Sequence, residues 1–155
     1  MRLLRVCRKN TLNTRGQTLV ETSMALLVAI PVILWSFEMG MFCYTLGQYQ
    51  YAARAGVQYA ISHGTDAPDC SGPGGTVNSS CPDPTGADIS DLVANVSHSS
   101  GHVLMSSQVK VSWGDLDNNP ASPVTVTISA PYQPYVDLPF VPAIITGTAT
   151  GQIVY

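Results

Sequence analysis

The chain has 155 residues, which is room for one modest domain besides a membrane segment. Charged residues make up only 11 % of it, against about 25 % in an ordinary soluble domain. Five of the seven lysines and arginines lie in the first fifteen positions, whereas all ten acids follow them. Beyond that basic head the basic residues are Arg54 and Lys110, so we expect no nucleic-acid surface.

A long apolar run follows the basic head. There is no charge from Thr22 to Phe37, and only Glu38 interrupts the charge-poor stretch that ends at Arg54. Basic residues before a hydrophobic span hold that end in the cytoplasm, so we expect a single pass with the C-terminal domain outside. An ordinary secretory signal is the alternative. Its apolar core has about 7–15 residues, which is shorter than this run.

One helix is predicted from about Thr18 to Ser62, within a helical region 17–63 that includes a membrane span of about 22–45. Pro31 removes one backbone hydrogen bond, which predicts a kink or a locally melted turn. Past the span, mostly small residues recur at helical spacing and predict close packing against a sheet. They are Leu46, Tyr49, Ala53, Gly56, Val57 and Ala60.

Two carboxylates lie in or near the predicted span. An acid within a membrane is expensive and usually has a partner or a function. Glu21 is either an interfacial residue or one that pairs with a positive group. Glu38 is either an interfacial residue or a second contact between packed helices.

Region 64–155 is predicted to form an external loop, a short helix and a β-rich domain. Proline and glycine mark the loop from Thr65 to Thr85, which contains Cys70 and Cys81. Outside the cytoplasm, this isolated pair predicts a disulfide. A metal site with a histidine is the rival, but no CxxC or HxxxH spacing supports it.

The remainder of the chain predicts an α+β fold. The sequence from Thr85 to Asp88 resembles a capping box, and apolar residues then follow helical spacing to about Ser97. Alternating residues predict strands at 109–113, 124–129 and 145–155, whereas the proline-spaced run 131–142 predicts a connection. A three-stranded antiparallel sheet packed on the outer half of the long helix would bury both apolar faces.

Signals for catalysis or a cofactor are poor. The stretch from Ser97 to His102 contains a serine and histidines without a fixed arrangement, so a polar loop is preferred to a hydrolase site. The run from Asp115 to Asn119 begins like a calcium loop, but Pro120 stands where glycine is expected and position 12 has no acid. A hairpin turn is the preferred interpretation. We expect no catalytic residues, no metal and no cofactor.

The string from Arg15 to Glu21, with its basic head and apolar run, resembles the prepilin-type leader of type IV pilins. The resemblance implies a leader at 1–16 and cleavage between Gly16 and Gln17 by a membrane prepilin peptidase. Glu21 would then be the fifth residue of the processed chain. There it could pair with the new α-ammonium group, on its own or on a neighbouring subunit.

The chain is also similar to the TadE-like family, pilin-like proteins of bacterial tight-adherence (Flp, type IVc) pilus assembly. The match rests on residues 15–21, on Pro31, on Glu38-Met39-Gly40 and on the alanine-rich segment 52–60. It implies a minor pilin or pseudopilin in the inner membrane, with other pilin-like subunits and the assembly platform as partners. Two alternatives stay open: a type II secretion pseudopilin, and an unprocessed single-pass envelope protein with a binding domain.

Overall fold

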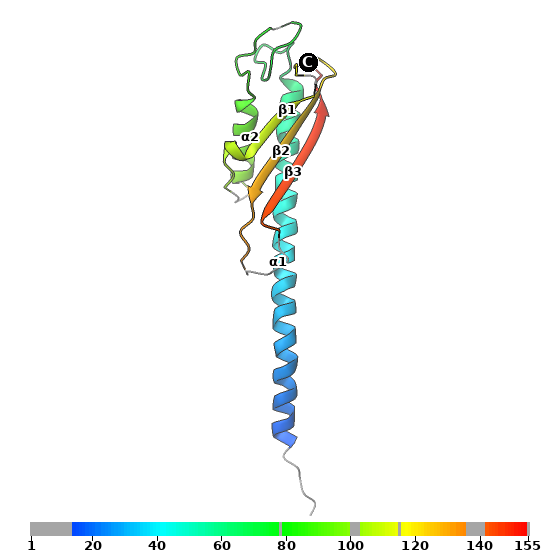
Figure 1. Ribbon diagram of the computed structural model, residues 1–155, viewed down its shortest axis with the longest axis vertical. Helices are drawn as coiled ribbons and strands as arrows, with labels where there is room; N and C mark the ends of the chain where they lie inside the picture. Colours follow the sequence, from blue (N-terminus) through cyan, green and yellow to red (C-terminus); the bar gives the residue numbers. More distant parts are fainter. Residues whose placement is uncertain (1–13, 78, 100–102, 115, 136–141, 155) are drawn as a thin grey trace, which may run out of the picture. The chain divides into compact units, whose positions relative to one another are not determined.

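A computed structural model describes residues 14–77, 79–99, 103–114, 116–135 and 142–154. The chain divides into two compact units, residues 1–37 and 38–155. One helix, α1 (Thr14–Ser62), contributes residues to both units (Figure 1). Helix α1 ends at Ser62, as the sequence predicts. It begins at Thr14, before the expected Thr18, and so includes residues 14–16 of the predicted leader.

The part of α1 that belongs to the first unit has an exposed apolar surface. Its large side chains, such as Leu27 and Ile33, are 74 % and 65 % exposed. The hydroxyl groups of Thr22 and Ser23 donate to the carbonyl groups four residues earlier. These polar groups are therefore satisfied within the helix, as a lipid environment requires.

The turn around Pro31 stays helical, so the locally melted turn that the sequence allows does not form. Proline removes a single N–H donor, which leaves only the carbonyl of Leu27 without its usual intrahelical partner. The hydrogen bonds on either side hold the helical backbone. By length and composition, the helical stretch Gly16–Ser62 is sufficient to cross a membrane.

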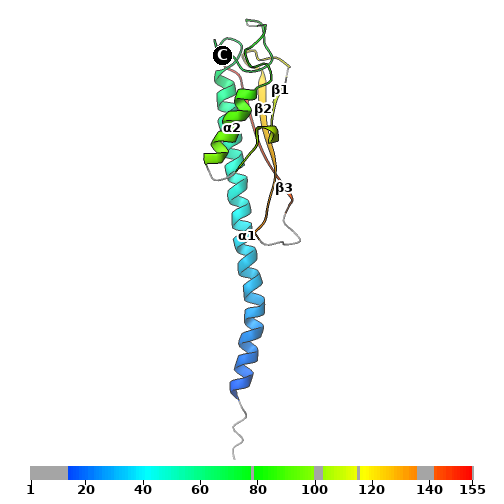
Figure 2. The same ribbon diagram turned by 90° about the vertical axis from the view of Figure 1, so that its left-hand side faces the viewer.

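The second unit has an α+β fold, as predicted. Besides its part of α1, the unit contains α2 (Ala87–Ser99), a 3₁₀ turn η1 (Ser106–Gln108), β1 (Val109–Trp113), β2 (Pro123–Pro131) and β3 (Ile144–Gln152). Its sheet is antiparallel with the order β1-β2-β3, and it packs against the second half of α1. Figures 1 and 2 show α1 and α2 on one side of this sheet.

The observed strands extend or shorten the predicted ones at their ends. Strand β2 is longer than the predicted 124–129 and includes a proline at each end, where a missing N–H is tolerated. Strand β3 ends at Gln152, so Ile153 continues the inward alternation without belonging to the strand. The predicted connection 131–142 lies between β2 and β3 except at Pro131, which is the last residue of β2 and pairs with Ile144; residues 136–141 fall outside the described part.

Small residues let β3 approach α1 closely. A Cβ atom on Gly147 would lie 2.9 Å from the backbone carbonyl carbon of Tyr49, and one on Gly151 would lie 2.6 Å from side-chain atoms of Val57 and Ile61. Glycine is therefore required on this face of β3 because a larger side chain would meet the helix. Ile145 and Ile153 flank the two glycines and are buried.

The N-terminus of α2 is capped differently from the prediction. The sequence suggests Thr85 as the cap, but the carboxylate of Asp83 accepts the backbone N–H groups of Ala87 and Asp88, at 2.9 and 3.0 Å. Thr85 instead donates its hydroxyl to Asp83. A carboxylate is the stronger partner at this position because it is charged and faces the positive end of the helix dipole.

Candidate functional site

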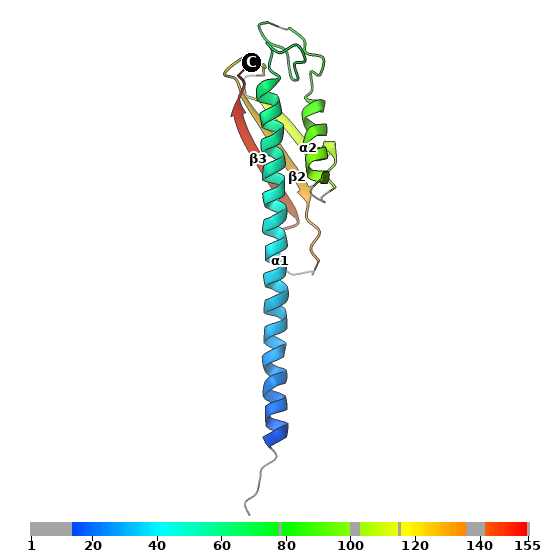
Figure 3. The ribbon, with the colours of Figure 1, turned by 180° about the vertical axis from the view of Figure 1, so that it is seen from behind.

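The carboxylate of Glu38 is fully buried and hydrogen-bonded within the second unit. Its Oε1 atom accepts the hydroxyl of Tyr132 at 2.7 Å, and its Oε2 atom accepts the backbone N–H of Tyr135 at 3.1 Å. Both donors belong to the segment that leaves β2, which Figure 3 shows beside α1. Glu38 thus fastens this segment to the helix, a role that neither sequence hypothesis contains.

Aromatic packing supports the same attachment. The ring of Phe42, one helical turn after Glu38, meets the ring of Tyr132 edge-on with centroids 5.6 Å apart. Burial raises the pKa of Tyr132, and the hydrogen bond to Glu38 and its negative charge raise it further. Tyr132 therefore remains a protonated donor at physiological pH.

The residues predicted for leader cleavage lie in the first turns of α1 as the structure describes it. Gly16, Gln17 and Glu21 are all exposed on α1. A Cβ atom added to Gly16 would meet no atom within 4 Å. The site is thus accessible, and packing does not explain a glycine there. Cleavage and pairing of Glu21 with an α-ammonium group remain predictions.

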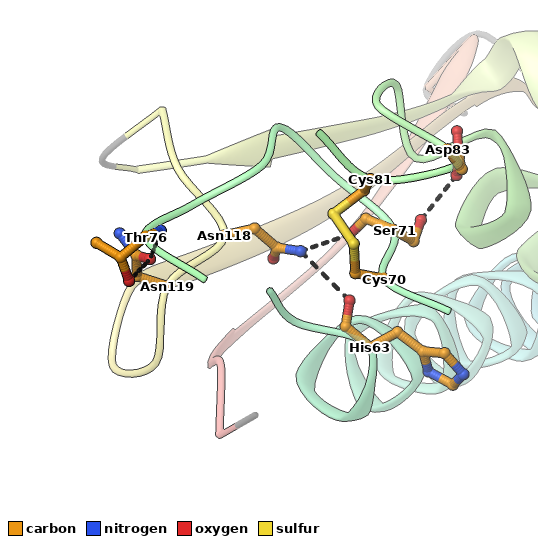
Figure 4. The surroundings of a disulfide bond; sticks show 8 residues. All are labelled: His63, Cys70, Ser71, Thr76, Cys81, Asp83, Asn118 and Asn119. Carbon is orange, nitrogen blue, oxygen red and sulfur yellow. Dashed lines mark hydrogen bonds between the residues drawn. A yellow bond between two sulfur atoms is a disulfide. The ribbon is translucent and has the colours of Figure 1, made fainter. Parts of the chain in front are cut away.

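The predicted disulfide between Cys70 and Cys81 is present, and both cysteines are buried (Figure 4). Next to it, Ser71 donates its hydroxyl to Asp83, and the backbone N–H of Gly72 donates to the carbonyl of Asp83. The disulfide therefore closes the loop at the point where Asp83 caps α2. Hydrogen bonds to Ser71, Ala87, Asp88 and Thr85 lower the pKa of Asp83, although burial alone would raise it.

The turn after β1 is tied to the same loop. The buried amide of Asn118 donates to the carbonyl oxygens of Ser71 and His63, at 2.9 and 3.3 Å, as Figure 4 shows. The Oδ1 atom of Asn119 accepts both the backbone N–H and the hydroxyl of Thr76. These bonds join segments more than 40 positions apart, so the loop, the end of α1 and the turn form one connected structure.

The possible calcium ligands have other partners where they are described. Asp117 accepts hydrogen bonds from the hydroxyl of Ser122 and from the side chain and backbone of Asn119, and these bonds lower its pKa. The arrangement is that of a turn stabilised from within. Asp115 lies outside the described residues. Within the described ranges, no three histidine, cysteine or acidic side chains come together as a metal site would need.

Among the residues of these networks that sequence reasoning missed are Tyr132, Asn118 and Asp83. Tyr132 lies 94 positions from Glu38, so no local pattern could link them. For Asp83 a signal existed, because an acid just before a predicted helix can cap it. For Asn118, the position in a predicted turn indicated local bonds and gave no sign of a buried partner.

Models of protein families, curated proteins and solved structures yield no match to this chain. The architecture itself defines the class. A long N-terminal apolar helix supplies residues to the core of a small antiparallel sheet, which is a pilin-like arrangement. The disulfide indicates that the sheet domain lies in an oxidising compartment outside the cytoplasm.

Proposed function

We propose that the chain is a membrane-anchored minor pilin or pseudopilin that assists the assembly of a tight-adherence (Flp) pilus. The observation that carries the proposal is the double character of α1. Its first part exposes apolar side chains over several turns, whereas its second part supplies Ala52, Ala53 and Ala60 to the core of the sheet domain. Soluble domains rarely expose so large a contiguous apolar surface to water.

The resemblance to the TadE-like family adds the pilus system to this physical picture. The basic head would lie in the cytoplasm, α1 would cross the inner membrane, and the disulfide-bonded domain would lie outside. A prepilin peptidase would cut between Gly16 and Gln17. The exposed apolar surface would then contact lipid or the helices of other pilin-like subunits, which the assembly platform organises.

Leader cleavage is the most direct test. The full chain is co-expressed with a prepilin peptidase, extracted from membranes, and analysed by intact mass and N-terminal sequencing. The expected N-terminus is Gln17, with the helix retained. An N-terminus at Met1, or one beyond Phe37, would contradict the proposal.

Two glycine variants sharpen the test. Gly16→Val should block cleavage without disturbing the fold, because an added side chain has open space there. Gly40→Val is the matched control, since its position is equally open and also helical. Cleavage of the Gly16→Val chain at the normal rate would show that the peptidase does not recognise this position.

A further inference from the structure

A cavity of about 310 Å³ lies in the second unit, between α1 and the segment that leaves β2. The described side chains that line it are uncharged, and they combine aromatic and aliphatic groups with hydroxyl and amide groups. Its size is at the lower end of the range for small-molecule sites. The lining residues that matter here are Thr45, Tyr49, Gln108, Tyr132, Gln133 and Tyr135.

The wall of this cavity is held in place by the contacts around Glu38. Tyr132 and the backbone of Tyr135 are fixed by hydrogen bonds to the buried carboxylate, and Tyr132 also packs on Phe42. The amide oxygen of Gln108 accepts the backbone N–H of Met105, which orients that side chain as well. Such prior ordering lowers the entropy that a ligand must overcome on binding.

The chemistry of the lining selects the ligand. An ion would lose hydration without meeting a side chain of opposite charge among the described lining residues. A purely apolar ligand would cover the side-chain amides of Gln108 and Gln133 without offering their N–H groups an acceptor, which is costly. A neutral sugar meets both demands, because its C–H faces pack on aromatic rings and its hydroxyls bond to amides and phenols.

We propose that this cavity binds a neutral saccharide, either a soluble sugar or the headgroup of a glycolipid. The two sources share the same recognising chemistry. The lining residues that α1 supplies are Met41, Thr45 and Tyr49, which lie at the outer end of the predicted membrane span, so both sources are accessible in the expected topology. The inference concerns the second unit and does not depend on the pilus role.

The test uses the full chain in nanodiscs of phosphatidylcholine and phosphatidylglycerol, which avoids sugar-based detergents. Glucose, maltose and the disaccharide of N-acetylglucosamine are added, and saturation-transfer NMR and titration calorimetry measure binding. In a second arm, monoglucosyldiacylglycerol is built into the nanodisc. Binding of any of these neutral sugars supports the proposal, and the arm in which it occurs identifies the source.

Two variants locate the bound sugar. Tyr135→Ala removes an exposed ring but keeps the backbone N–H that serves Glu38, and Gln133→Ala removes an amide. Each should weaken the affinity about tenfold, which corresponds to about 1.4 kcal/mol. Tyr51→Ala and Gln50→Ala are matched controls on exposed positions of α1 outside the cavity, and they should bind as the natural chain does.

Three results would overturn the inference. The first is the absence of saturation transfer to every neutral sugar in both arms. The second is equal affinity in the cavity variants and the controls while circular dichroism shows that all are folded. The third is tighter binding of glucuronate or of a neutral tripeptide than of neutral sugars, which would assign the cavity to a different ligand.

Discussion

Tyr132 donates its hydroxyl to the Oε1 atom of Glu38 at 2.7 Å, which joins the end of the sheet to α1 across 94 positions of the chain. Glu38 is the first residue of the second unit and is fully buried. Burial of a carboxylate is costly unless donors satisfy its oxygens. Tyr132 and the backbone of Tyr135 supply a donor to each oxygen, so this acid is part of the domain's own framework.

Removing the Tyr132 hydroxyl should therefore destabilise the domain. Tyr132→Phe keeps the ring on Phe42 but leaves one oxygen of a buried carboxylate without this donor, which should cost about 1–3 kcal/mol. Thermal unfolding of the full chain in nanodiscs measures the effect. Tyr51→Phe, at an exposed position of α1, is the control. Equal melting temperatures for both variants would show that the bond contributes nothing.

Loss of the disulfide should loosen the loop that caps α2. Replacing Cys70 and Cys81 by serine removes a link across 11 positions, and the chain-entropy model gives about 3 kcal/mol for a loop of this size. Chemical unfolding of the natural and double-variant chains measures the difference. Cys43→Ser, which changes an exposed free cysteine, should leave stability unchanged. Recovery of both natural thiols free from native membranes would contradict the disulfide itself.

Asp83 should make the stability of the second unit depend on pH in the acid range. Its pKa is lower in the folded chain than in the unfolded chain, where it is about 3.9. The stabilisation is therefore fully present above about pH 4 and is lost as pH falls through the folded pKa. Asp83→Asn should cost about 1–3 kcal/mol at pH 7, because an amide nitrogen cannot accept the hydrogen bonds that one carboxylate oxygen now accepts. The gap between the two chains should narrow at acid pH.

The control for this experiment is Asp91→Asn, which changes an exposed acid elsewhere on α2. Its unfolding free energy should stay within about 0.5 kcal/mol of the natural chain at both pH values. A gap for Asp83→Asn that is constant between pH 7 and pH 3 would show that ionisation of Asp83 contributes no stability.

The periodic elements of this fold could be predicted because their signals are local. The alternation from Val109 to Trp113 gave β1 at its observed bounds, and the small-residue pattern around Ala53 and Gly56 gave the packed side of α1. The ends of elements were less accurate. Strand β2 extends beyond its predicted limits because a terminal proline can complete a strand without donating a hydrogen bond.

The contacts that fix Glu38 could not be predicted, for a different physical reason. An acid near an apolar run indicates a partner but does not identify it, because the partner is chosen by the tertiary fold. Tyr132 lay in a segment that the sequence marked only as a connection. The disulfide was predictable because the oxidising compartment and two neighbouring cysteines restrict the choice to one pair.

Because β3 lies close to α1, replacing a glycine of β3 by alanine should cost more stability than replacing an open glycine of α1. Gly147→Ala places a methyl group 2.9 Å from the backbone of Tyr49, which cannot move aside as a flexible side chain can, so about 1–3 kcal/mol should be lost. Gly47→Ala has open space within α1 and should be neutral or slightly stabilising. Thermal unfolding compares the two variants, and a larger loss for Gly47→Ala would contradict the described packing.

Replacement of Glu21 tests whether the exposed apolar part of α1 takes part in pilus assembly. A carboxylate and a new α-ammonium group in a membrane should pair with each other, because either charge alone costs several kcal/mol there. Glu21→Gln removes the attraction but keeps shape and some hydrogen bonding. We expect normal membrane insertion and leader cleavage, with reduced crosslinking to other pilin-like subunits and reduced piliation. Because Glu21 is exposed on α1, the fold of the second unit should not change. Unchanged recovery of partners and unchanged piliation would make Glu21 an ordinary interfacial residue.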